Sequence, residues 1–110
     1  MPLPYDMGNA GDLVKHGLLA EFAHWWCSHE RRPLRFLDPF AGQPWVSPPN
    51  KEVARRLEAL PRCAIHDAQP EPATRYYGSS YAVLHAARAA GCSAQVYVSD
   101  SNSEALRAFQ

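Results

Sequence analysis

Two acidic side chains occupy positions where they could hold a ligand. Asp38 follows the short apolar run 34–37, and Asp100 follows the run 94–99. Both runs have the composition of buried strands, and open parallel sheets bind ligands outside the carboxyl ends of their strands, so the two carboxylates predict one shared crevice. A carboxylate in the position of Asp100 can accept hydrogen bonds from both ribose hydroxyls of an adenosine cofactor. A helix N-cap or a solvent-exposed turn acid is an equally weighted interpretation of Asp100.

A turn containing Gly42 follows the first of these strands, at 38–44. A residue without a side chain lets the backbone approach a ligand closely, although any tight turn can contain the pattern Asp-x-x-Ala-Gly. The sequence has no GxxxxGK[ST] phosphate loop and no HExxH or comparable spacing, so neither a nucleoside triphosphatase nor a metal site is predicted. The scattered histidines are expected to be surface or core residues rather than ligands: His24, His29, His66 and His85.

The first helix is predicted between residues 10 and about 30. Its apolar residues recur at three- and four-residue steps, which is typical of a long amphipathic helix. These residues are Leu13, Val14, Leu18, Phe22, Trp25 and Trp26. Arg31, Arg32 and Pro33 are expected to end the helix before the first strand.

Two further helices are predicted between the strands. One covers 51–60, within the proline-rich segment 45–74 that we interpret as an insertion, and the other covers 81–90 and ends at Gly91. A capping box at 101–104 then predicts the start of another helix after the second strand.

This order of elements predicts an α/β domain with a partial Rossmann-like fold. The chain of 110 residues would form one incomplete domain, the N-terminal half of a parallel sheet with a helical insertion. Two parallel strands do not make a stable doubly wound sheet, because such sheets need both faces covered. We therefore expect a continuation of the chain or a partner chain, including self-association that covers the sheet.

Composition indicates a soluble globular protein, with 46% hydrophobic and 20% charged residues. Lys and Arg equal Asp and Glu in number, so the overall positive field of a free-standing nucleic-acid binder is absent. Three cysteines without a CxxC pair predict reduced thiols in a cytoplasmic protein, with neither a disulfide framework nor a zinc site. No export signal and no membrane span are expected.

Four segments in order resemble the signposts of one family. They are 8–16 (Gly-Asn-Ala-Gly-Asp-Leu-Val-Lys-His), 37–42 (Leu-Asp-Pro-Phe-Ala-Gly), 75–79 (Arg-Tyr-Tyr-Gly-Ser) and Asp100. The similarity covers nearly the whole chain, and its first segment is the most specific. The family is that of the bacterial large-subunit (23S) ribosomal RNA adenine-N6 methyltransferases, which have a class I S-adenosylmethionine fold with a helical insertion.

The resemblance implies S-adenosylmethionine as cofactor and ribosomal RNA as partner. It implies that His16 and Ser79 contact the cofactor with Lys15 close by, that Gly42 lines the pocket, and that Asp100 binds ribose hydroxyls. Without the resemblance, Lys15 and His16 would be interpreted as the polar face of the first helix, and a helix N-cap would be as natural a role for Ser79.

The chain also departs from the family. Phe40 stands where the family has a histidine and Pro44 where it has a glycine, and no Asp-Pro-Pro-Tyr-type motif for the target adenine follows. Our first hypothesis is the N-terminal cofactor-binding part of a methyltransferase, inactive alone, whose catalytic residues lie outside this chain. The alternative is a non-catalytic, truncated binding or interaction module that self-associates.

Overall fold

Helices and short strands alternate along the chain. The computed structural model describes residues 7–30, 32–39 and 43–99. Its elements are α1 (Ala10–His29), β1 (Leu34–Asp38), β2 (Trp45–Val46), α2 (Val53–Glu58), α3 (Ala64–Ala68), β3 (Tyr76–Tyr77), α4 (Ser79–Ala89) and β4 (Ala94–Val98). All elements predicted within these residues form. The short α3, β2 and β3 were not predicted, because two strands of two residues and a helix of little more than one turn are too short to show a periodicity.

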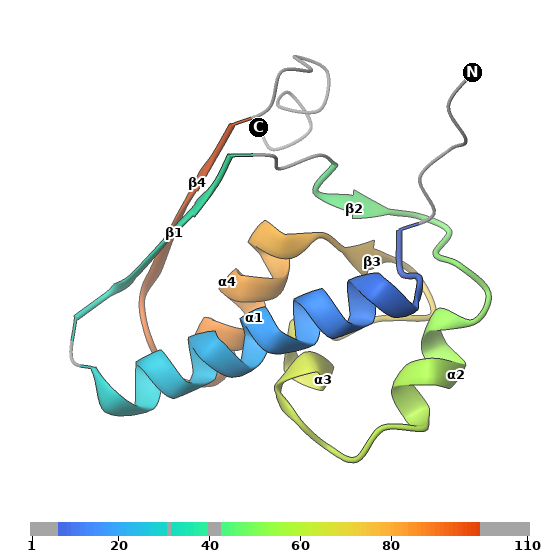
Figure 1. Cartoon of the computed structure of the whole chain (residues 1–110), viewed down its shortest axis with the longest axis horizontal. Coiled ribbons are helices and arrows are strands. Elements are labelled where there is room, and N and C mark those ends of the chain that lie inside the picture. Colours follow the sequence, from blue (N-terminus) through green and yellow to red (C-terminus); the bar gives the residue numbers. More distant parts are fainter. Residues whose placement is uncertain (1–6, 31, 40–42, 100–110) are drawn as a thin grey trace.

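The strands β1 and β4 pair side by side in parallel (Figure 1). In their register Asp38 lies opposite Val98, and the Ser99 backbone N–H donates to the Asp38 carbonyl at 2.9 Å. The predicted pairing and direction are thus confirmed, and both carboxyl ends lie at one edge. Asp100 and the helix predicted after it lie outside the described residues.

The helices lie on one side of this strand pair (Figure 1). Leu34 is buried toward them, whereas Leu37 and its register partner Tyr97 are exposed on the other side. This bare face also carries Arg35 and Gln95. A mixed α/β fold with a two-stranded parallel sheet is therefore present, and within the described residues it is covered on one face.

Alanine dominates the core beside the sheet. The buried cluster joins α1, α3 and α4 to β1, with Leu34 and Val83 as its larger members. The others are Ala20, Ala23, Ala64, Ala68, Ala82, Ala86 and Ala87. Small side chains let the three helices approach closely, so little space remains for bulky groups between them.

The segment 45–74, interpreted as an insertion, contributes to a second cluster near the start of α1. Val53, Leu57 and Ile65 are buried there against Tyr76. In addition α3 packs on both α1 and α4. The segment is therefore part of the same packed body.

The face that α1 buries differs from the face that carries its apolar pattern. Its buried residues are Asp12, His16, Ala20 and Ala23. By contrast, four of the large apolar residues that predicted the helix are exposed: Val14, Leu18, Phe22 and Trp25. The helix was correctly predicted, but its apolar stripe is not its buried face, because the close contacts with α3 and α4 admit only small side chains.

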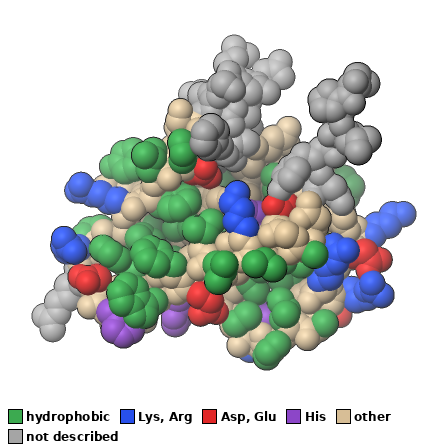
Figure 2. Space-filling view, in the orientation of Figure 1, with side chains coloured by type: hydrophobic (Ala, Val, Ile, Leu, Met, Phe, Trp, Pro, Cys, Tyr) green, Lys and Arg blue, Asp and Glu red, His purple; other side chains and the backbone are tan. Residues whose placement is uncertain are grey.

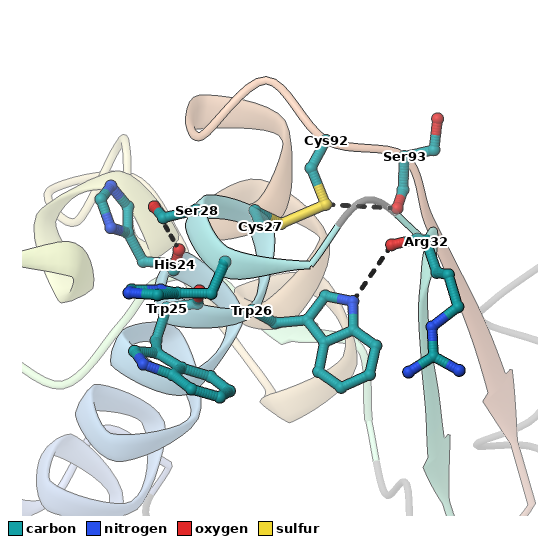
Figure 3. The surroundings of a disulfide bond; sticks show 9 residues. His24, Trp25, Trp26, Cys27, Ser28, Arg32, Cys92 and Ser93 are labelled. Carbon is teal, nitrogen blue, oxygen red and sulfur yellow. Dashed lines mark hydrogen bonds between the residues drawn. A yellow bond between two sulfur atoms is a disulfide. The ribbon is translucent and has the colours of Figure 1, made fainter.

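A disulfide joins Cys27 at the end of α1 to Cys92 in the turn after α4 (Figure 3). The two Cα atoms are 5.5 Å apart although 65 residues separate them. The prediction of reduced thiols is wrong for this pair, because spacing along the sequence does not reveal which turns the fold brings together. Cys63 is a free, exposed thiol. Beside the bridge, the Trp26 indole donates to the Arg32 carbonyl at 3.2 Å.

Candidate functional site

Two hydrogen bonds fix the start of α1. Asn9 is the N-cap, and its side-chain oxygen accepts from the Asp12 backbone N–H at 3.0 Å. The Asp12 carboxylate in turn accepts from the Gly8 N–H at 2.9 Å. Gly8 has φ +97°, and a Cβ there would lie 2.5 Å from a Val53 methyl group. This most specific segment of the sequence therefore builds a helix start, and it orients His16 one turn later.

His16 is buried against the second cluster. Its Nδ1 lies 2.7 Å from the hydroxyl of Tyr76, which leaves only Nε2 of the ring to contact a ligand. Burial lowers the pKa of His16 to about 4; Lys15 adds to the lowering, while the charges of Asp12 and Asp38 oppose it. The imidazole is therefore neutral at pH 7. Lys15 itself is exposed.

Asp38 is buried at the carboxyl end of β1. The Ser80 hydroxyl donates to its Oδ2 over a long 3.5 Å contact. Ser79 and Ser80 are both buried and open α4, with Gly78 rather than Ser79 as the N-cap. The predicted Ser79 is thus in the right turn, but the hydroxyl that reaches Asp38 is that of its neighbour.

Gly78 brings the chain after the β1 turn against the start of α4. Its N–H donates to the Pro44 carbonyl at 2.9 Å, and a Cβ there would lie 2.9 Å from the Gln43 carbonyl oxygen. A larger residue at Gly78 would push these backbones apart. Residues 43 and 44, just before β2, therefore lie against the start of α4.

We define the β1-end site as His16, Asp38, Ser79, Ser80 and Tyr76. The structure brings three predicted residues to it, from α1, β1 and α4, and adds Tyr76 and Ser80. Ser80 was not predicted, although a pair of serines at the start of a helix could have indicated it. Gly42 and Asp100 lie outside the described residues.

The β1-end site offers hydrogen-bonding groups in a buried setting. It combines one carboxylate, a neutral imidazole and hydroxyls, so it can accept hydrogen bonds from amino and hydroxyl groups and donate in return. It lies at the first turn of α4, where the partial positive charge of a helix N-terminus favours an anionic group. This donor set suits a polar, zwitterionic or nucleoside-like ligand.

The two tyrosines in the segment 75–79 serve packing. Tyr76 and Tyr77 are both buried. Gln69 holds the Tyr77 backbone from both sides, donating to its carbonyl and accepting from its N–H, each at 2.8 Å. The structure therefore gives both tyrosines a packing role.

Comparison with solved structures finds the crystal structure of protein LPL1258 from Legionella pneumophila str. Philadelphia 1, of the family DUF519. The TM-score is 0.64 at 19% sequence identity, and the match covers 91% of this chain and 42% of that one. The two proteins therefore share a fold over this region, and the chain spans less than half of the neighbour's length. No protein-family model matches the chain, and no curated protein matches it either.

Two further features bear on partners. In residues 7–30, 32–39 and 43–99 no helix combines the length and apolarity needed to cross a bilayer. In the same residues no three His, Cys, Asp or Glu side chains gather as potential metal ligands.

Proposed function

We propose that the chain is the N-terminal, cofactor-binding part of an S-adenosylmethionine-dependent methyltransferase that acts on an adenine N6 in ribosomal RNA. The parallel β1–β4 pair would then belong to a Rossmann-like class I methyltransferase sheet. The observation that carries the proposal is the buried Asp38 at the carboxyl end of β1, with His16 and Ser80 beside it. This is where open parallel sheets bind their ligands.

The donor set of the β1-end site fits this cofactor. His16, Asp38 and Ser79 would hold it, with the exposed Lys15 at the rim, and the resemblance extends the set to Gly42 and Asp100. S-adenosylmethionine, when bound, supplies an electrophilic methyl group. A carboxylate and hydroxyls match the amino and hydroxyl groups of such a ligand, and the start of α4 matches its carboxylate.

The charge state of His16 supports the same assignment. Burial keeps the imidazole neutral at pH 7, so it adds no positive charge that would repel a sulfonium ligand. Tyr76 fixes the ring through Nδ1 and therefore presets the direction of Nε2. Tyr76 acts here as a positioning residue.

This chain would bind the cofactor, and it would not carry out methyl transfer by itself. The groups that bind the adenine amine would come from outside it, since no Asp-Pro-Pro-Tyr-type motif is present. The match covers 42% of the neighbour's chain, so a protein of that length would have further residues in which such groups could lie.

Calorimetric titration of the folded chain with S-adenosylmethionine tests the proposal. We expect binding that Asp38→Asn and His16→Gln each weaken by about tenfold or more, which equals the loss of one charge-assisted hydrogen bond. Glu58→Gln, on the exposed end of α2, is the matched control and should bind as the wild type does. Circular dichroism verifies that each variant is folded. A folded chain that gives no heat at about 1 mM ligand contradicts the cofactor assignment.

A further inference from the structure

An apolar groove runs along the first half of α1. It lies between α1 and the segment 56–65 and encloses about 620 Å³. The helix residues that line it extend from Ala10 to Glu21, so the groove is about 16 Å long at 1.5 Å per residue. Figure 2 shows hydrophobic side chains gathered along α1 and beneath it. The larger apolar side chains of the walls are Leu13, Val14 and Leu18 on α1, and Leu60 and Ile65 across from them.

The two ends of the groove differ in their chemistry. Arg56 lies at the end next to the start of α1, where its guanidinium donates to the Gly8 carbonyl at 3.4 Å. Cys63 lines the opposite end, next to Glu21, because the Glu21 carboxylate accepts from the Ala64 N–H at 2.9 Å. An apolar channel therefore leads to a thiol.

Cys63 has a histidine beside its thiol. It is the exposed free cysteine, since the other two of the chain form the disulfide. The Nδ1 atom of His66 lies 3.8 Å from Cys63 Sγ. The Nε2 atom of His66 lies 2.9 Å from the Leu57 carbonyl, which can only accept, so in the neutral ring Nε2 carries the proton and Nδ1 the lone pair. A thiol, a base that faces it and a group that orients the base form the pattern of an activated cysteine.

His66 has a partner in each of its protonation states. In the neutral ring Nδ1 accepts from the Cys63 backbone N–H at 3.1 Å, which is part of the capping box of α3. In the protonated ring Nδ1 can donate to the Cys63 carbonyl oxygen, which lies 3.2 Å away. A role in capping alone needs only the first of these contacts. The imidazole can therefore take a proton from the thiol and return it while it stays in place.

We propose that Cys63 accepts an acyl group from an acyl thioester and that the acyl chain lies in the groove. His66 Nδ1 takes the thiol proton while Sγ bonds to the carbonyl carbon of the donor. The bond between that carbon and the donor's sulfur then breaks. His66 returns the proton to this sulfur, so the donor leaves as a free thiol. Donor and product are both thioesters, so the exchange needs no further reactant, and excess thiol returns Cys63 to its free form.

The walls of the groove suit an acyl chain better than a peptide. Apart from Arg56, Glu21 and Cys63 at the ends, the residues that line the groove are apolar. Their side chains cannot pair the N–H and C=O groups that an extended peptide would bring. An acyl chain has only methylene and methyl groups beyond its carbonyl, and each of them gains by leaving water. The groove is separate from the β1-end site, so this inference does not depend on the proposed cofactor.

Intact-mass spectrometry of the whole chain after incubation with decanoyl-coenzyme A or acetyl-coenzyme A tests the proposal. We expect one acyl group, which hydroxylamine removes at neutral pH and which Cys63→Ser abolishes. Transfer should be about tenfold or more faster from the decanoyl donor, because the groove binds its chain. A wild-type chain that gains no decanoyl group overturns the proposal, and so does one that both donors acylate equally fast.

Gly17→Leu tests the place of the chain. Gly17 lines the middle of the groove, and a Cβ there would lie 3.7 Å from Ile65 Cδ1, an ordinary contact, so the new side chain fills the groove without shifting the backbone. Decanoyl transfer should slow about tenfold or more, whereas acetyl transfer should be unchanged. Ala89→Leu, at an exposed position of α4, is the matched control and should change neither. If Gly17→Leu leaves decanoyl transfer unchanged, the chain does not lie in the groove.

His66→Asn tests the base. Its amide oxygen can still accept from the Cys63 N–H, but it cannot take up the thiol proton. Transfer from both donors should slow about tenfold or more, and imidazole in the buffer should restore part of the rate, which a purely structural role of His66 does not allow. His24→Asn, at an exposed histidine of α1, is the control, and circular dichroism verifies each fold. A folded His66→Asn variant that reacts as the wild type does, or that imidazole fails to rescue, contradicts the role of His66 as the base.

Discussion

The imidazole of His16 and the hydroxyl of Tyr76 share a hydrogen bond of 2.7 Å although 60 residues separate them. Both side chains are buried, so neither can exchange this partner for water. The bond ties α1 to β3, directly before the start of α4. The same contact therefore supports the fold and orients a residue of the candidate site.

Removal of the Tyr76 hydroxyl should cost stability. Tyr76→Phe leaves a buried imidazole nitrogen without its partner, so we expect the free energy of unfolding to fall by about 1–3 kcal/mol. Urea denaturation followed by circular dichroism measures it. Tyr97→Phe removes a hydroxyl whose bond lies on the exposed bare face, and it should change stability by less than about 0.5 kcal/mol. If the two substitutions changed the free energy of unfolding equally, the buried hydrogen bond would contribute no more to stability than the exposed one.

Acid should destabilise the fold through His16. Its pKa of about 4 in the folded state lies below the ordinary 6.5, so the unfolded chain binds the proton more readily. The free energy of unfolding therefore includes a contribution from neutral His16 that is fully present above about pH 6.5. This contribution is lost as the pH falls toward 4, and the total loss is about 3 kcal/mol. Denaturation midpoints across this range measure the slope.

His16→Gln should flatten this pH dependence, whereas His24→Gln should preserve it, because His24 is an exposed histidine on the same helix. A slope that survives His16→Gln would assign the acid sensitivity to other groups.

The disulfide should contribute strongly to stability, because the alanine-rich core offers few large side chains. Closing a loop of 65 residues restricts the unfolded chain, and this is worth about 4 kcal/mol. Reduction, or Cys27→Ser, should therefore lower the melting temperature markedly. Cys63→Ser, at the free and exposed thiol, is the control and should leave it unchanged.

Mass spectrometry of alkylated protein isolated from its cell tests the pairing directly. We expect a linked Cys27–Cys92 peptide and an alkylated Cys63. The predicted cytoplasmic location would favour reduced thiols. Recovery of the pair fully alkylated would therefore contradict the disulfide as the native state.

The strands and their direction were predictable because local signals specify them. The run 34–37 is apolar and bounded by Pro33 and a turn, and the run 94–99 is rich in β-formers. Their parallel pairing then follows from the helix between them. Asp38 was found for the same reason, since it lies at the carboxyl end of the first predicted strand, whereas His16 was assigned only through the resemblance to the methyltransferase family.

Features that depend on contacts between distant residues were not predictable. The Tyr76 contact with His16 and the Cys27–Cys92 bridge join segments whose proximity no local pattern encodes. The buried face of α1 could not be predicted for a related reason. Periodicity identifies an apolar stripe, but here the fold packs Ala20 and Ala23 inward and leaves the larger residues outside.

The helix α1 buries small side chains and exposes large apolar ones, and this arrangement can be tested by substitution. Ala20→Leu places a large side chain between α1 and its neighbouring helices, where overpacking costs about 1–3 kcal/mol. Leu18→Ala, two residues away on the exposed face of α1, should change the stability by less than about 0.5 kcal/mol. Urea denaturation of each variant measures both changes. If α1 instead buried its large apolar residues, the order would reverse, because Leu18→Ala would create a cavity and Ala20→Leu would point into solvent.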